Sequence, residues 1–155
     1  MNDNQFKNRG IAVSGEDFAA AELEMGVTLP TDLKKFIGSV SNGGVPQRAY
    51  WPLNNGEFLW VNCFLPLKNS FGRGRTIEET YQFCRKMNFL PEGCIPFAID
   101  YGGNYFCADQ RGTVFFFATD ELHLDRSIEQ NMESAQQCLD NGIIEFWNGL
   151  KEEGY

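Results

Sequence analysis

Three segments of the chain repeat apolar residues at the spacing of an α-helix. The first covers residues 18–25 and follows Ser14, a residue that caps helix N-termini well. Its apolar face carries Phe18 and Met25, and Gly26 is suited to end it. This pattern predicts an amphipathic helix near the start of the chain.

A second helix is predicted with Pro30 in its first turn, where the missing N–H of proline costs nothing. Its apolar stripe is formed by Leu33, Phe36, Ile37 and Val40. We expect Asn42-Gly43-Gly44 to end this helix, because glycine accepts the left-handed conformation of a C-cap.

A third helix is predicted from a capping box formed by Thr76 and Glu79, and it runs to about Met87. Its inward positions are Ile77, Tyr81 and Cys84.

Two further patterns indicate antiparallel strands. Residues 95–99, 105–108 and 113–117 are apolar runs separated by turns rich in Asp, Asn and Gly, which predicts a three-stranded meander. Residues 48–53 and 57–65 flank Asn-Asn-Gly and predict a hairpin. Because the second run of that hairpin is almost continuously apolar, we expect it to be covered on both faces.

The two ends of the chain are less regular. Residues 1–13 show little periodicity and are expected to be partly loose, whereas residues 140–150 predict a final amphipathic helix. Residues 124–139 are compatible with a helix but carry few apolar anchors. Together the elements predict a soluble α+β domain without a linker or repeat.

Length and composition agree with one packed domain. The chain has 155 residues, of which 43% are hydrophobic, and it contains 14 Phe. It has neither an apolar run long enough to span a membrane nor the basic-then-apolar order of a signal peptide. We therefore expect a cytoplasmic protein with no membrane partner.

The net charge of −8 is concentrated at the C-terminal end. Residues 120–155 account for −7 of it, which disfavours direct binding of nucleic acid. Six of these acids are candidate contacts for a basic protein partner: Asp120, Glu121, Glu129, Glu133, Asp140 and Glu145. On charge alone, a solvated acidic surface is the simpler interpretation.

Candidate chemistry is sparse. The five cysteines are scattered without a Cys-x-x-Cys pair, which fits small buried residues better than a metal site or a disulfide framework. His123 is the only histidine, and we interpret it as a surface or packing residue. Neither Gly-rich segment, residues 72–74 nor residues 102–104, has phosphate-loop spacing. The sequence therefore predicts no catalytic residues, no metal and no cofactor.

Asp100 and Asp109 bracket one strand and could be imagined as paired carboxylates, but Asp at such turns usually bonds local backbone N–H groups. The aromatic residues of the hairpin region are candidates for recognition or for core packing: Tyr50, Trp51, Trp60 and Tyr101. We name Tyr50 and Trp51 as candidate partner contacts.

Two motifs in order resemble the SUKH superfamily, also called the Smi/Knr-type domain. The first covers residues 29–37 with the following Asn-Gly-Gly, and the second covers residues 95–104 with residues 107–109 and 112–115. The signature positions are Pro30, Asn42, Gly43, Gly44, Pro96, Asp100, Gly102, Gly103, Asn104 and Asp109. The resemblance implies a single domain over residues 1–155, with its core at about 14–151. It also implies helices packed on a curved, largely antiparallel sheet and mainly structural roles for the signature residues.

The resemblance further implies a cytoplasmic, non-enzymatic immunity protein that binds and neutralises a cognate secreted toxin, often a nuclease. Two alternatives stay open. One is an intracellular scaffold or regulatory adaptor without a toxin partner, and the other is a small-molecule or enzymatic role for a pocket near Tyr101 and Cys107.

Overall fold

The computed structural model describes residues 4–8, 10–68, 75–122 and 125–152. The helices are α1 (Gly15–Met25), α2 (Thr31–Ser39), α3 (Ile77–Lys86), the short 3-10 helix η1 (Thr119–Glu121), α4 (Ile128–Ala135) and α5 (Ile143–Gly149). The strands are β1 (Tyr50–Pro52), β2 (Phe58–Trp60), β3 (Cys63–Phe64), β4 (Ile95–Ile99), β5 (Tyr105–Ala108), β6 (Val114–Phe117) and β7 (Gln136–Asp140).

The strands form two antiparallel sheets, and the prediction of an α+β domain is confirmed. The larger sheet has the order β3-β4-β5-β6-β7, and the smaller one is the β1–β2 hairpin. The predicted meander is β4, β5 and β6, paired so that Tyr105 lies opposite Phe117. Pro96 lies beside an irregularity in the pairing of β4 with β5, a place where its missing N–H is tolerated.

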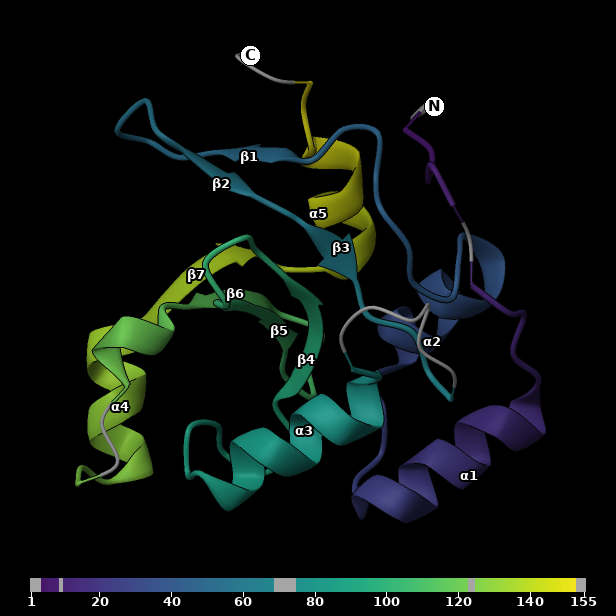
Figure 1. Ribbon diagram of the computed structural model, residues 1–155, viewed down its shortest axis with the longest axis horizontal. Coiled ribbons are helices and arrows are strands. Elements are labelled where there is room, and N and C mark those ends of the chain that lie inside the picture. Colours follow the sequence, from purple (N-terminus) through teal and green to yellow (C-terminus); the bar gives the residue numbers. More distant parts are fainter. Residues whose placement is uncertain (1–3, 9, 69–74, 123–124, 153–155) are drawn as a thin grey trace.

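Helices cover both faces of the larger sheet (Figure 1). Alternation along β5 directs Phe106 to one face, where its ring centroid lies 5.5 Å from that of Phe146 on α5. The same alternation directs Cys107 to the other face, where it joins a buried cluster with Cys84 of α3. The sheet is therefore buried on both sides near its centre.

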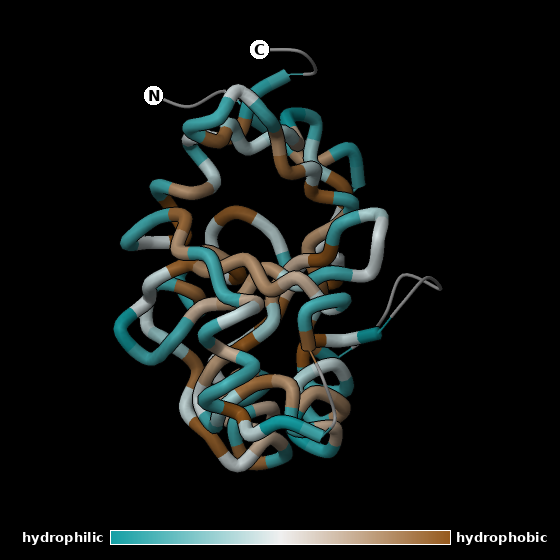
Figure 2. Tube along the Cα trace, turned by 90° about the vertical axis from the view of Figure 1, so that its left-hand side faces the viewer, coloured by the Kyte–Doolittle hydropathy of each residue, from teal (hydrophilic) through white to brown (hydrophobic). Residues whose placement is uncertain are grey.

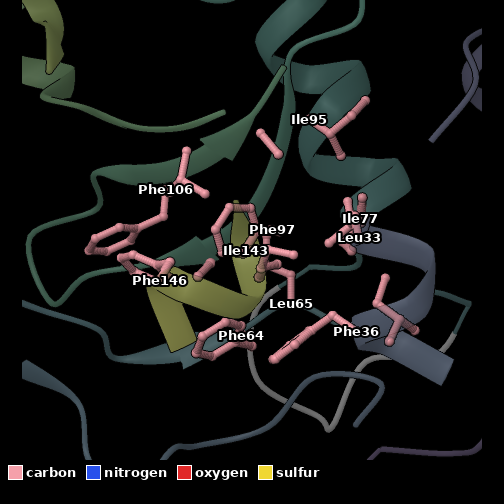
Figure 3. Packing of buried hydrophobic residues seen from close by; sticks show 14 of the residues in the cluster. Leu33, Phe36, Phe64, Leu65, Ile77, Ile95, Phe97, Phe106, Ile143 and Phe146 are labelled. Carbon is pink, nitrogen blue, oxygen red and sulfur yellow. The ribbon is translucent and has the colours of Figure 1, made fainter. Parts of the chain in front are cut away.

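The main core combines aromatic rings with aliphatic side chains (Figure 3). Phe64 lies among Phe36 of α2, Phe97 of β4 and Phe146 of α5, at ring-centroid distances of 5.4, 5.8 and 6.4 Å. Figure 2 shows hydrophilic residues concentrated in the outer loops. Burial of these rings and of the aliphatic side chains around them holds the helices on the sheet.

Two helix starts follow the sequence closely. In α1 the Ser14 hydroxyl accepts from the N–H of Asp17 at 3.2 Å, and the Asp17 carboxylate accepts from the N–H of Ser14 at 2.8 Å. In α3, Thr76 and Glu79 form the predicted reciprocal pair. These capping boxes confirm the predicted beginnings of both helices.

The prediction for the end of α2 is wrong. The helix begins just after Pro30 and ends at Ser39, and its C-cap Val40 is right-handed. Asn42 instead clamps the following chain, because its side chain accepts from the N–H of Leu67 at 2.7 Å and donates to the Leu67 carbonyl at 3.0 Å. Asn42 therefore connects two distant segments of the chain and does not cap the helix.

The two glycines after Asn42 allow close chain crossings. Gly44 has φ +126° and exchanges backbone hydrogen bonds with Phe64. A side chain at Gly43 would strike the backbone nitrogen of Pro66 at 2.8 Å. Only glycine fits at such an approach.

The prediction of one long second hairpin strand covered on both faces is also wrong. Residues 57–65 form two strands: β2 pairs with β1, and β3 joins the larger sheet. Phe58 and Trp60 are 36% and 44% exposed. The apolar run is long because it supplies one strand to the hairpin and then another to the larger sheet.

The described part of residues 124–139 is only partly helical. Helix α4 ends at Ala135 and is followed directly by β7, which pairs with β6. The final helix begins at Ile143 rather than Asp140, which ends β7. An edge strand exposed on one side needs few apolar residues, so its pattern is weak.

The described part of residues 1–13 is anchored to the core. Phe6 is buried, and its ring stacks on Trp147 of α5 with centroids 4.6 Å apart. The Asn4 side chain also bonds the backbone of Arg48 at 2.8 and 3.1 Å. The expectation of a loose segment therefore fails for residues 4–8.

Candidate functional site

The β1–β2 hairpin has two chemically different faces. Tyr50 lies directly opposite Trp60, and Trp51 lies opposite Leu59. Because side chains alternate along a strand, these two cross-strand pairs point to opposite sides of the hairpin. Asn-Asn-Gly closes it, with Gly56 at φ +85°, as a three-residue hairpin loop requires.

One face carries an aromatic ridge, which we define as Tyr50, Phe58, Trp60 and Tyr101. The ring centroids of Tyr50 lie 5.0 Å from Trp60 and 6.0 Å from Phe58. Tyr101 comes from the β4–β5 turn, and its ring lies 4.4 Å from that of Trp60. It is 60% exposed. Rings of this size contacting one another at the surface are typical of a recognition site.

Asp100 builds the turn that presents Tyr101. Its Oδ1 accepts from the N–H groups of Gly102 and Asn104 at 2.9 and 2.8 Å, and its Oδ2 accepts from the Asn104 side chain at 2.8 Å. Asn104 in turn accepts from the N–H of Thr119 at 2.7 Å. The signature segment of the sequence thus holds one end of the ridge in place.

Asp109 forms a similar turn at the other end of β5. Its Oδ1 accepts from the N–H groups of Arg111 and Thr113 at 2.9 and 3.0 Å. Asp100 and Asp109 therefore lie at opposite ends of one strand, each engaged by local backbone. They do not form a carboxylate pair.

Trp51 belongs to the inner face of the hairpin. Its ring centroid lies 4.9 Å from that of Phe146, and it is packed against the core. Tyr50 and Trp51 are adjacent in sequence but do not share a surface. Alternation along the predicted strand was enough to separate them, because neighbouring residues of a strand point to opposite faces.

The acidic residues of the C-terminal quarter fall into separate groups. Asp120 and Glu121 lie on η1, next to the Asn104–Thr119 contact and therefore near the turn of the ridge. Helix α4 carries Glu129 and Glu133 beside a shallow hollow of about 570 Å³ and packs on η1.

The other two candidate acids, Asp140 and Glu145, lie beyond the far end of α4, on β7 and α5 (Figure 1). The acidic quarter is therefore not one continuous face. Of these acids, Asp120 and Glu121 on η1 are the ones that lie near the ridge.

Two buried cysteines, Cys84 and Cys107, lack the environment of a nucleophile. Cys107 is fully buried, and burial raises its pKa well above the usual value. Burial also raises the pKa of Cys84 to about 12. A reactive thiol needs the opposite shift. Cys107 faces α3, whereas Tyr101 belongs to the ridge, so the structure does not join them in a pocket.

The remaining candidates form no further site. His123 and residues 72–74 lie outside the described residues. Arg75 stacks over the ring of Phe83 at 4.6 Å, and Arg85 donates to the Leu90 carbonyl. Within the described part of the chain, no group of three or more His, Cys, Asp or Glu is arranged to hold a metal ion, and no helix is long and apolar enough to cross a membrane.

Sequence reasoning missed Phe58 as part of the ridge. The signal was present, because Phe58 and Trp60 are two residues apart on one strand and therefore share the face opposite to that of Leu59. The proximity of Tyr101 could not be read from the sequence, because it depends on how the hairpin lies over the larger sheet.

Fold and surface together define a small α+β domain with a cluster of aromatic rings at its surface. Residues 12–148 match the SMI1 / KNR4 family (SUKH-1), and the chain belongs to that family. A crystal structure of a protein from Pseudomonas syringae pv. tomato is similar over 72% of each chain, with a TM-score of 0.50 and 14% identity. That likeness concerns the fold alone. A comparison with curated proteins gave no match.

Proposed function

We propose that this chain is a cytoplasmic immunity protein that binds and neutralises a cognate secreted toxin, a basic nuclease. The observation that carries the proposal is the aromatic ridge, because it offers a recognition surface on a member of the SUKH-1 family. Membership in this family is consistent with such a role.

The ridge has the features of a binding hot spot. Trp and Tyr are the residues that most often dominate binding energy, and each can contribute about 2 kcal/mol or more when a partner covers it. Trp60 and Tyr101 are exposed, yet their rings are held by mutual contact and by the Asp100 turn. Little ordering entropy is then lost when a partner binds.

Charge favours a basic partner. The net charge is −8, and the acids Asp120 and Glu121 lie near the turn that carries Tyr101. Such a surface attracts a cationic protein at long range. On contact, Arg side chains of the partner can stack on the faces of Trp60 and Tyr101.

The proposed mechanism is occlusion and requires no reaction. A nuclease must expose basic residues to hold phosphate, so an acidic surface with aromatic anchors can cover that site. In this proposal the chain acts as a binder and not as an enzyme, without cofactor, metal, nucleic acid or membrane.

The resemblance to bacterial SUKH proteins implies a toxin gene adjacent to the gene for this chain, and the test uses the toxin domain which that adjacent gene encodes. We expect a tight 1:1 complex and rescue of cells that express the toxin. Replacing Trp60 and Tyr101 together by Ser should weaken binding by at least about a hundredfold, since two hot-spot residues are lost. The variant loses ring contacts worth about 0.5 to 1.5 kcal/mol each, so thermal unfolding is used to choose an assay temperature at which it is fully folded.

Leu23 provides the matched control. It is 85% exposed on α1, away from the hairpin, so Leu23→Ser removes a similar exposed apolar group. We expect unchanged affinity. Full affinity of the Trp60/Tyr101 variant would rule out the ridge as the contact. Absence of both complex and rescue would reject the immunity function and favour the adaptor alternative.

A further inference from the structure

Strand β7 forms one edge of the larger sheet. It pairs with β6 on one side, and no other described strand pairs with its outer side. Native proteins protect such edges with charged residues such as Lys, with Pro or with bulges, and the segment Gln-Gln-Cys-Leu-Asp contains neither Lys nor Pro. Val114 pairs with Asp140 and Phe115 pairs with Cys138, so Leu139 is an extra, bulged residue of β7. The regular pairing of β7 with β6 therefore ends at Cys138.

The ladder with β6 shows which backbone groups face outward. The N–H of Ala118 donates to the carbonyl of Ala135 at 3.2 Å, and in an antiparallel ladder the bonded pairs then recur every second residue. The next bonded pair is Phe116 with Gln137. Cys138 must therefore direct its N–H and C=O away from β6.

A groove of about 540 Å³ lies along this edge. Its β7 wall is formed by three consecutive residues, Gln137, Cys138 and Leu139. Consecutive residues of a strand point to opposite faces, so a hollow that touches all three lies at the strand's edge. The opposite wall is the hairpin, and it includes Trp51 and Leu59 from the inner face.

We propose that this groove receives an extended segment of the toxin, which adds to β7 as a sixth strand. Backbone hydrogen bonds to Cys138 would provide affinity, and Trp51 and Leu59 would hold apolar side chains of the incoming strand. Among the described residues that line the groove, Glu57 is the charged one, and Asp140 follows at the end of β7. A neutral to basic segment with alternate apolar residues therefore fits best.

The hairpin also argues against a second copy of this chain as the occupant. A second β7 would arrive together with its own β6 and the rest of its sheet. The hairpin closes the groove on the side where that sheet would have to continue. A single extended segment needs only the spacing of one added strand.

This inference rests on the proposed function, and its test separates the two. Amide hydrogen exchange is measured for the full chain, free and in complex with the toxin domain encoded by the adjacent gene. We expect exchange of the Cys138 amide to slow at least tenfold in the complex. The Gln137 amide, already bonded to β6, should change little and serves as the internal reference.

Two substitutions at one position provide an independent readout. Cys138→Pro removes the outward N–H and leaves the Gln137 bonds to β6 in place, whereas Cys138→Val keeps the N–H. We expect at least tenfold weaker toxin binding for Cys138→Pro and unchanged binding for Cys138→Val. If Cys138→Pro does not fold, hydrogen exchange of the Cys138 amide in the unmodified protein tests the groove proposal by itself.

A tight complex in which Cys138 exchanges as fast as in the free protein would overturn the groove proposal and leave the immunity function standing. Concentration-dependent protection of Cys138 without toxin would identify a second copy as the occupant and also overturn it. Absence of any complex with the toxin would reject both proposals.

Discussion

The ring centroids of Trp60 and Tyr101 lie 4.4 Å apart, although Trp60 belongs to the hairpin and Tyr101 to a turn of the larger sheet. This contact joins the hairpin to the β4–β5 turn and makes one surface from two. We expect a double-mutant cycle with Trp60→Ala and Tyr101→Ala to give a coupling of about 0.5 to 1.5 kcal/mol in the free energy of unfolding. Denaturant titration of the four proteins measures it, and strictly additive effects would contradict the contact.

The turn at Asp100 should matter for binding, whereas the similar turn at Asp109 should not. Each carboxylate accepts two backbone N–H bonds, so Asp100→Ala and Asp109→Ala should each cost about 1 to 3 kcal/mol of stability. Only Asp100 positions Tyr101. We expect about tenfold weaker toxin binding for Asp100→Ala and normal binding for Asp109→Ala, measured by calorimetry at a temperature where both are folded. Equal affinities would show that the turn does not position the ridge.

The acids near the ridge should control the rate of association. Reversal of Asp120 and Glu121 to Lys should slow toxin association about tenfold at low salt and reduce its salt dependence. Reversal of Glu16 and Glu24 on α1 changes the net charge equally but far from the hairpin (Figure 1). Stopped-flow measurements compare the toxin association rates of the two double variants. Equal slowing in both variants would indicate a general effect of net charge.

Phe6 should contribute to stability as a core residue. Its ring stacks on Trp147 and is only 7% exposed, so Phe6→Ala should lower the free energy of unfolding by about 3 kcal/mol. Ile11→Ala, at a position that is 62% exposed, should change it by less than about 0.5 kcal/mol. Chemical denaturation measures both, and a neutral Phe6→Ala would mean that residues 4–8 do not hold the core.

Glu78 should make stability depend on pH. Its side chain is buried, with Oε2 accepting from the N–H of Lys68 at 2.9 Å and Oε1 without a hydrogen bond among the described residues. Burial raises its pKa above the usual 4.5. As the pH rises above 4.5, the unfolded chain therefore loses this proton first, and the folded state loses stability until the pH passes the folded-state pKa.

The variant Glu78→Gln removes this ionisation. We expect it to be more stable than the unmodified protein at neutral pH. That advantage should shrink as the pH falls toward 4.5 and reach a constant low value below it. Urea titrations across this range give the difference, and an advantage that does not vary with pH would exclude an ionised Glu78 as its cause.

Local sequence determined the elements whose signals are short in range. Ser14 with Asp17 and Thr76 with Glu79 mark two helix starts by themselves, and the Asp and Gly positions of the meander mark its turns. These features depend on hydrogen bonds between residues two to four apart. A sequence shows such neighbours directly.

Tertiary structure decided everything that depends on which distant segments meet. The sequence pattern predicted that Asn42 ends a helix, but its side chain bonds the backbone of Leu67. The role of Phe6 as a core residue is recognised only from its contact with Trp147. The strand β7 is defined by its pairing with β6, not by its own weak pattern. The candidate site has the same origin, because packing of the hairpin over the larger sheet brings Trp60 to Tyr101. Burial and cross-strand pairing act over long sequence separations, and the hydrophobic pattern of one segment does not name its partner.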